Sequence, residues 1–241
     1  MEFEKVKINK KLFYWTWRDL DFLPYSWLEK KDLKNLPTPF LLTEIHPDCP
    51  IGFETEEKEW FTNIIKLPDS FDKLKLDNNL RKDLKRVEKK NENIKLVYNE
   101  KDALDKSKKW FLEFWKENKK DFKRRLEIWK EKCYTISAYL NEELIAVHIA
   151  MKEKDTATIF YLGCWWNRKY SPLSIPTFLL KKDIEKAIED NMKFYDLEVG
   201  DEPYKKKWGV IEKPTKYYAV LTKELAENLE IKRYVEIKDK S

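Results

Sequence analysis

Between residues 94 and 222 the apolar side chains switch repeatedly between a spacing of two residues and a spacing of three or four. The first spacing is typical of strands and the second of helices. Strands are therefore predicted at 94–98, 134–140, 144–151, 156–165, 194–199 and 216–222. Helices are predicted at 101–119, 121–132 and 175–191, with a short helical piece between the last two strands.

The three middle strands are joined by short polar segments, residues 141–143 and 152–155. Connections of this length form hairpins, so these strands are expected to form an antiparallel meander. The order of elements is β-α-α-β-β-β-α-β-(short helix)-β. This order is unlike a doubly wound sheet and predicts an α/β (α+β) fold, in which helices flank a mixed, mainly antiparallel sheet.

The strand at 194–199 leads into a cluster of ionisable side chains that are candidates for chemistry. They are Asp196, Glu198, Tyr204 and Lys205. Asp196 and Glu198 are two residues apart, so a regular strand aims both carboxylates at one face. Strand ends that carry charged groups into a cleft often hold the chemistry of α/β proteins. A charged surface loop is the alternative interpretation.

The motifs around this strand resemble those of the GNAT acyltransferases. The matching stretches are Ser171-Pro172, the helix after it, and then Phe194-Tyr-Asp-Leu, Gly200-Asp-Glu-Pro-Tyr-Lys205 and Trp208. They are most similar to the branch known as cellulose-biosynthesis-type (CelD/BcsL-like) acetyltransferases, which is related to Fem-like transferases. The resemblance covers roughly residues 60 to 222. It implies a GNAT-like domain over 61–241, preceded by an irregular aromatic- and proline-rich segment, residues 1–60, that packs on the core.

The resemblance also implies a reaction, the direct transfer of an acyl group from acyl-CoA to an amine. Glu198 is the first candidate for the base and Asp196 the second, while Tyr204 would protonate the departing thiolate. Lys205 would orient the substrate or stabilise developing negative charge. Backbone N–H groups at the end of the strand at 156–165 would polarise the thioester carbonyl. These residues are Gly163, Cys164 and Trp165.

Coenzyme A would be held through its phosphates at the start of the helix at 175–191. The candidate residues are Arg168, Lys169, Ser171, Ser174, Ile175 and Thr177. Backbone N–H groups and the helix dipole favour phosphate at such a position. Ser174 is expected to cap the helix. The loop from Ser171 to Pro176 departs from the family pattern because it contains no glycine, and Pro176 removes one donor.

Two other functions stay open at this point. An aminoacyl-tRNA-dependent transferase of the Fem or arginyl-transfer type would use tRNA as donor, with contacts from the basic stretches at 81–90 and 116–132. A degenerate, non-catalytic binding module would explain the glycine-free loop. The acyl-CoA enzyme is favoured over both. The acceptor, a small-molecule or peptide amine, and the oligomeric state cannot be read from the sequence.

Composition indicates the environment in which the protein works, but it does not indicate the reaction. Charged residues make up 39% of the 241 residues and glutamine is absent, a pattern typical of thermophilic proteins. The net charge of +5 comes from 49 basic and 44 acidic residues, and so requires no polyanionic partner. Three cysteines without paired spacing indicate a reducing, cytoplasmic setting. No metal site is expected from the single pair His46 and Cys49, and no apolar run reaches the length of a membrane span.

Overall fold

The computed structural model describes the backbone of residues 4–8, 11–15, 40–45 and 56–220, apart from 101, 116–118 and 155–156. Side chains are described between residues 62 and 212, with gaps. The chain divides into two compact units, Met1–Thr62 with Lys213–Ser241, and Asn63–Glu212. The expectation that residues 1–60 pack on the core rests on side chains outside the described part of the chain, as do His46 and Cys49.

The described residues of the first unit form strands. Its strands are β1 (Glu4–Ile8), β2 (Lys11–Trp15), β3 (Phe40–Ile45) and the larger parts of β4 (Glu56–Lys66) and β10 (Ile211–Val220). β1 and β2 are antiparallel, β2 and β3 are parallel, and β3 is antiparallel to β10. β10 begins five residues before the strand predicted at 216–222.

The second unit holds the predicted meander. Its strands are β5 (Lys95–Tyr98), β6 (Cys133–Leu140), β7 (Glu143–Glu153), β8 (Thr158–Trp166) and β9 (Phe194–Val199). They follow the end of β4 in the order β4-β9-β8-β7-β6-β5. The pairs β5–β6, β6–β7 and β7–β8 are antiparallel, whereas β8 and β9 are parallel. The prediction of a mixed, mainly antiparallel sheet is confirmed.

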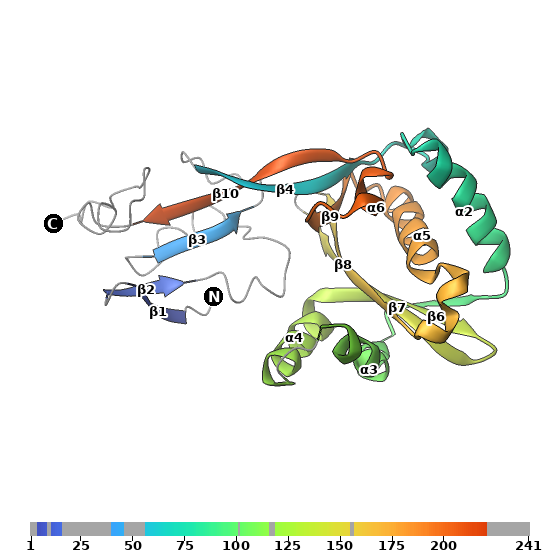
Figure 1. Cartoon of the computed structure of the whole chain (residues 1–241), viewed down its shortest axis with the longest axis horizontal. Helices are drawn as coiled ribbons and strands as arrows, with labels where there is room; N and C mark the ends of the chain where they lie inside the picture. Colours follow the sequence, from blue (N-terminus) through green and yellow to red (C-terminus); the bar gives the residue numbers. More distant parts are fainter. Residues whose placement is uncertain are drawn as a thin grey trace. The chain divides into compact units, whose positions relative to one another are not determined.

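Helices cover both faces of this sheet (Figure 1). They are α2 (Asn78–Lys90), α3 (Ala103–Trp115), α4 (Lys119–Lys132), α5 (Ile175–Glu189) and the short α6 (Pro203–Lys206). The alternation along β7 separates the two layers. Val147 and Ile149 pack with buried residues of α3 and α4, whereas Ala150 packs with those of α2 and α5.

The starts of α2 and α5 have local causes. Asp77 caps α2, since its side chain accepts hydrogen bonds from the backbone of Asn79 and Leu80. Ser174 occupies the N-cap position of α5, as predicted, but its backbone is left-handed with a φ of 54°. Its side chain makes no capping hydrogen bond, so the turn into α5 depends on backbone conformation.

Candidate functional site

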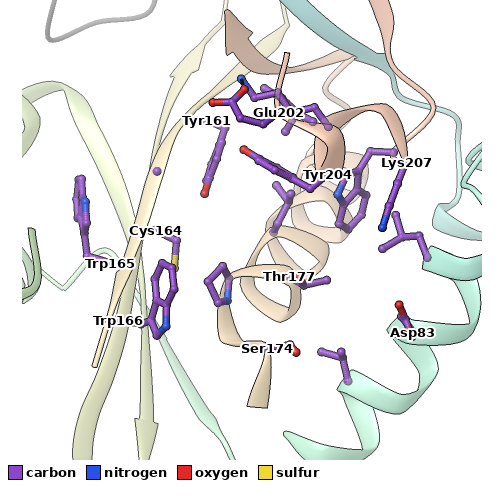
Figure 2. Close-up of a pocket in the computed structure, with 18 of the residues that line it drawn as sticks. Asp83, Tyr161, Cys164, Trp165, Trp166, Ser174, Thr177, Glu202, Tyr204 and Lys207 are labelled. Carbon is purple, nitrogen blue, oxygen red and sulfur yellow. Dashed lines mark ion pairs between the residues drawn. The ribbon is translucent and has the colours of Figure 1, made fainter. Parts of the chain in front are cut away.

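A pocket of about 610 Å³ opens where β8 and β9 stop pairing (Figure 2). The two strands pair from Thr158–Phe194 to Phe160–Asp196. The next residue of each strand, Tyr161 and Leu197, lines the pocket. Further parts of the wall come from α2, the amino end of α5, and α6. The pocket lies wholly within the second unit.

An irregularity in β8 shapes the inner wall of this pocket. Tyr161 pairs with Ala150 and Gly163 pairs with Ile149, so Leu162 is an extra residue in β8. A bulge of this kind bends a strand and disturbs its hydrogen-bond ladder. Gly163 has a φ of 138°, a conformation that side-chain-bearing residues rarely adopt. The bulge therefore lies in the strand from which the thioester-polarising N–H groups were expected.

One end of the pocket, the α5 end, carries groups suited to phosphate. Ser174, the N-cap residue of α5, and Thr177, in its first turn, line it. The first N–H groups of a helix have no partner within the helix, and they point toward such a ligand. Arg168 also lines the pocket, and its guanidinium carbon lies 4.0 Å from the centre of the Trp166 ring.

The structure brings six of the nine predicted coenzyme A residues to the pocket: Gly163, Cys164, Trp165, Arg168, Ser174 and Thr177. It does not bring the other three there. Ile175 is fully buried in the core. Ser171 donates to the carbonyl of Arg168, and the Lys169 ammonium lies 5.2 Å from the Tyr170 ring.

The opposite end, the β9 end, contains Glu198 in an unusual backbone conformation. Its φ is 65°, in the left-handed region that costs an ordinary residue roughly 1–2 kcal/mol. Asp196 Oδ1 accepts the Glu198 N–H at 2.7 Å. Asn63 Nδ2 donates to the Glu198 carbonyl at 2.9 Å and to the Gly200 carbonyl at 2.7 Å. Buried polar groups therefore hold this residue on both sides.

This conformation separates the two carboxylates that were expected on one face of β9. Glu198 lines the pocket together with its neighbour Leu197, so the strict alternation of the strand is lost here. Asp196 is fully buried and is not part of the pocket wall. The difference arises because the pairing of β9 with β8 ends at Asp196, and the left-handed backbone at Glu198 breaks the alternation beyond it.

Two tyrosines line the pocket together with Glu198, Tyr204 from α6 and Tyr161 from β8, and Figure 2 shows the two phenols close to each other. Burial raises the pKa of Tyr204 well above its usual value of 10, and Glu202 and Glu198 raise it further. Burial likewise raises the pKa of Tyr161, with smaller contributions from Cys164, Tyr204 and Glu198. Both phenols consequently stay protonated at neutral pH and can donate a proton or a hydrogen bond.

Lys205 belongs to the same end of the pocket, but its ammonium is held in place. Only 4% of its side chain is exposed, and Nζ lies 2.9 Å from a Glu202 carboxylate oxygen. Nζ also donates to the Glu198 carbonyl at 3.3 Å. Lys205 thus joins α6 to the end of β9.

Cys164 faces the pocket as a neutral thiol. Burial raises its pKa far above the usual value, which disfavours the nucleophilic thiolate. His148 pairs with Cys164 in the sheet register, but its Nε2 lies 2.8 Å from Asp183 Oδ2 on α5. This geometry favours a buried structural pair over a Cys–His nucleophile.

The sequence motifs gave no indication of several residues at the site. They are Asn63, Tyr161 and Trp166, while Arg86 was expected only as part of the basic stretch at 81–90. Asn63 lies in β4, a strand that the apolar spacing did not predict. Arg86 belongs to a helix whose basic face also fits simple solvent exposure, and its guanidinium lies 2.9 Å from Asp83.

The family model for the acetyltransferase (GNAT) domain matches residues 75–206. The match spans more than half of the chain. The chain belongs to this GNAT family. The matched residues include the bulge in β8, the amino end of α5, and Glu198 and Tyr204.

Several solved structures share the fold of this chain at low sequence identity. FemX has a TM-score of 0.63 at 12% identity, covering 95% of this chain and 85% of that one. L-PGS from Bacillus licheniformis has a TM-score of 0.58 at 13%, covering 95% and 84%. The C-terminal domain (DUF2156) of a putative lysylphosphatidylglycerol synthetase from Agrobacterium fabrum has 0.60 at 11%, covering 95% and 83%. No curated protein sequence matches the chain.

Two further findings concern the described residues alone. None of their helices has the length and apolar character needed to cross a membrane. None of their His, Cys, Asp and Glu side chains form a group of three or more that is placed to hold a metal ion.

Proposed function

We propose that this GNAT-family chain is an N-acyltransferase that moves an acetyl or other acyl group from acyl-CoA directly to an amine. One observation carries the proposal: the amino end of α5, Glu198 and Tyr204 all line a single pocket. The first suits a phosphate-bearing donor and the other two suit the proton transfers of aminolysis.

The donor would lie with its phosphates against the α5 end of the pocket. Thr177 would offer its backbone N–H there, Ser174 its hydroxyl, and Arg168 would add positive charge, whereas the Ser174 N–H already donates to the Ser171 carbonyl at 3.1 Å. The family's glycine-rich loop gives the chain freedom to turn tightly over phosphate. Ser174, with its left-handed φ of 54°, makes that turn here without glycine.

The acyl group would lie at the bulge of β8, beside Gly163 and Cys164. A backbone N–H released from the ladder by the bulge would stabilise the oxyanion of the tetrahedral intermediate. Glu198 would take a proton from the attacking ammonium, and Tyr204 would protonate the departing thiolate. The raised pKa of Tyr204 suits this role, because the phenol keeps its proton until the thiolate leaves.

In this scheme Asp196 and Lys205 act through Glu198 rather than on the substrate. Asp196 holds the Glu198 N–H and Lys205 holds its carbonyl. The acceptor would be a small-molecule or peptide amine in a cytoplasmic setting. Within the family, the motif from Phe194 to Trp208 favours the cellulose-biosynthesis-type branch.

Aminoacyl-tRNA as donor is the second candidate. The observation that favours it is the exposed basic face of α2, whose lysines Lys82, Lys85 and Lys89 lie on the helix that also gives Arg86 to the pocket. Binding through such a face would weaken steeply with salt. The fold likeness to FemX is compatible with this donor but carries no further weight.

Calorimetric titration with acetyl-CoA, with free coenzyme A alongside, tests the proposal. We expect saturable micromolar binding, followed by thiol release when amines are added. The amine panel contains small primary amines, a peptide with a free amino terminus, a lysine side chain and an amino sugar. No heat and an unchanged melting temperature would overturn the acyl-CoA proposal. Salt-sensitive binding of aminoacyl-tRNA would then favour the second candidate, and its absence a non-catalytic module.

A further inference from the structure

Glu198 lines the pocket with a left-handed backbone, and three buried side chains hold this conformation. Asp196, Asn63 and Lys205 bind its N–H and its carbonyl. All three are buried, with residue exposures of 0%, 1% and 3%. Strained backbone of this kind persists where the surroundings over-determine it, and it often marks a functional position.

Asn63 differs from the other two because it binds both carbonyls of the turn. One Nδ2 group donates to Glu198 and to Gly200, the residues on either side of Val199. Two carbonyl partners also settle which atom of the amide is the nitrogen. Asn63 comes from β4, more than 130 residues earlier in the chain, so it ties the turn to a neighbouring strand.

We propose that Asn63 is a positioning residue that fixes Glu198 in its left-handed conformation and thereby aims the Glu198 carboxylate into the pocket. The kinetic consequences of this proposal rest on the acyltransfer function proposed above. Its structural consequence, the fixed conformation of Glu198, does not. Without the amide donor, the Gly200 carbonyl loses this partner and the Glu198 carbonyl keeps only the longer bond from Lys205, so the turn relaxes toward extended backbone. The carboxylate then leaves the pocket.

The chain offers a matched control in Asn91. Asn91 is 2% exposed, and its Nδ2 donates to the carbonyls of Val87 and Leu173 at 2.7 and 2.9 Å. It therefore matches Asn63 in burial and in donating from Nδ2 to two backbone carbonyls. Leu173 directly precedes Ser174, so Asn91 supports the α5 end of the pocket rather than the β9 end.

The test compares Asn63→Asp with Asn91→Asp in the full chain. Each change is isosteric and sets an oxygen against two carbonyl oxygens. For Asn63→Asp we expect kcat to fall about tenfold to a hundredfold while the KM for acetyl-CoA stays within about twofold. For Asn91→Asp we expect the reverse, a raised KM for acetyl-CoA with a smaller effect on kcat. Equal losses of kcat in the two variants would overturn the proposal.

Amide hydrogen exchange gives a readout that needs no activity. The Glu198 N–H bonds to Asp196 Oδ1, so its protection reports on the turn. We expect Asn63→Asp to lose this protection and Asn91→Asp to keep it. Absence of turnover in the wild type would refute the proposed function. A loss of amide protection in Asn63→Asp would still support the proposal that Asn63 fixes the backbone of Glu198. Unchanged protection of the Glu198 N–H in Asn63→Asp would refute that role of Asn63.

Lys205→Met keeps the proposal testable if Asn63→Asp does not fold. It removes the other donor to the Glu198 carbonyl while leaving Asn63 in place. We expect a partial loss of Glu198 amide protection and a smaller fall in kcat than for Asn63→Asp. Full protection with normal kcat would count against any role for the carbonyl contacts.

Discussion

The two ends of the pocket are each held by a buried asparagine, yet they present chemistry in opposite ways. At the α5 end the functional groups are those of a helix start, and Asn91 supports the loop just before it. At the β9 end one side chain, Glu198, is directed by a strained turn that Asn63 supports. A helix amino end binds phosphate through several backbone groups, whereas a base depends on the position of one carboxylate. The β9 end should therefore be far more sensitive to single substitutions.

Glu198→Gln should have the largest effect and is the strongest test of the difference between the two ends. The amide keeps the size of the side chain but cannot take a proton from the acceptor ammonium. We expect kcat to fall about 10²- to 10⁴-fold, with acetyl-CoA affinity within about twofold of wild type. Glu189→Gln, an exposed change near the end of α5, is the control and should leave both unchanged. A near-normal kcat for Glu198→Gln would remove Glu198 from the mechanism.

Tyr204→Phe should lower kcat about tenfold to a hundredfold, because the departing thiolate loses its acid. The pH profile sharpens this assignment. The raised pKa of Tyr204 keeps the phenol protonated beyond pH 10, so its ionisation should not reduce wild-type activity between pH 7 and 9.5. If wild-type activity falls between pH 7 and 9.5 and Tyr204→Phe shows no such fall, then Tyr204 ionises in that range. That result would contradict its assignment as the acid.

Two substitutions of Asp196 distinguish its role as a positioning residue from a role as the base at the β9 end. Asp196→Asn keeps an oxygen that can accept the Glu198 N–H, whereas Asp196→Ala removes it. We expect kcat for the asparagine variant within about fivefold of wild type, and a loss of about tenfold or more for alanine. Equal, large losses for both would point to Asp196 itself as the base.

Arg168→Ala should affect the α5 end alone. Its guanidinium is exposed and stacks on Trp166, so the loss is one charge among several phosphate contacts. We expect the KM for acetyl-CoA to rise about three- to tenfold with kcat unchanged, and the difference from wild type to shrink at high salt. Lys152→Ala, a charge change on β7 outside the pocket wall, should show neither effect. A fall in kcat at saturating donor would contradict the separation of the two ends.

The sequence predicted the α5 end better than the β9 end, for a physical reason. A helix start has local signals, and Pro176 and Ser174 lie where the structure begins α5. The alternating pattern also predicted the meander correctly. The turn at Glu198 has no such signal, since it depends on Asn63 from β4, a contact across 135 residues. The burial of Asp196 was not predicted either, because strand alternation alone places Asp196 and Glu198 on the same face.

Ser174→Gly addresses the smallest expected effect, the lack of glycine at the α5 end. A glycine would adopt the left-handed conformation of Ser174 without the steric cost, but would add entropy to the unfolded chain. These terms oppose each other, so we expect the free energy of unfolding to change by less than about 1 kcal/mol. If Ser174 contributes only the shape of the turn, the KM for acetyl-CoA should stay within about twofold. A tenfold rise would assign the hydroxyl itself to the donor, and the α5 end would then depend on one side chain as the β9 end does.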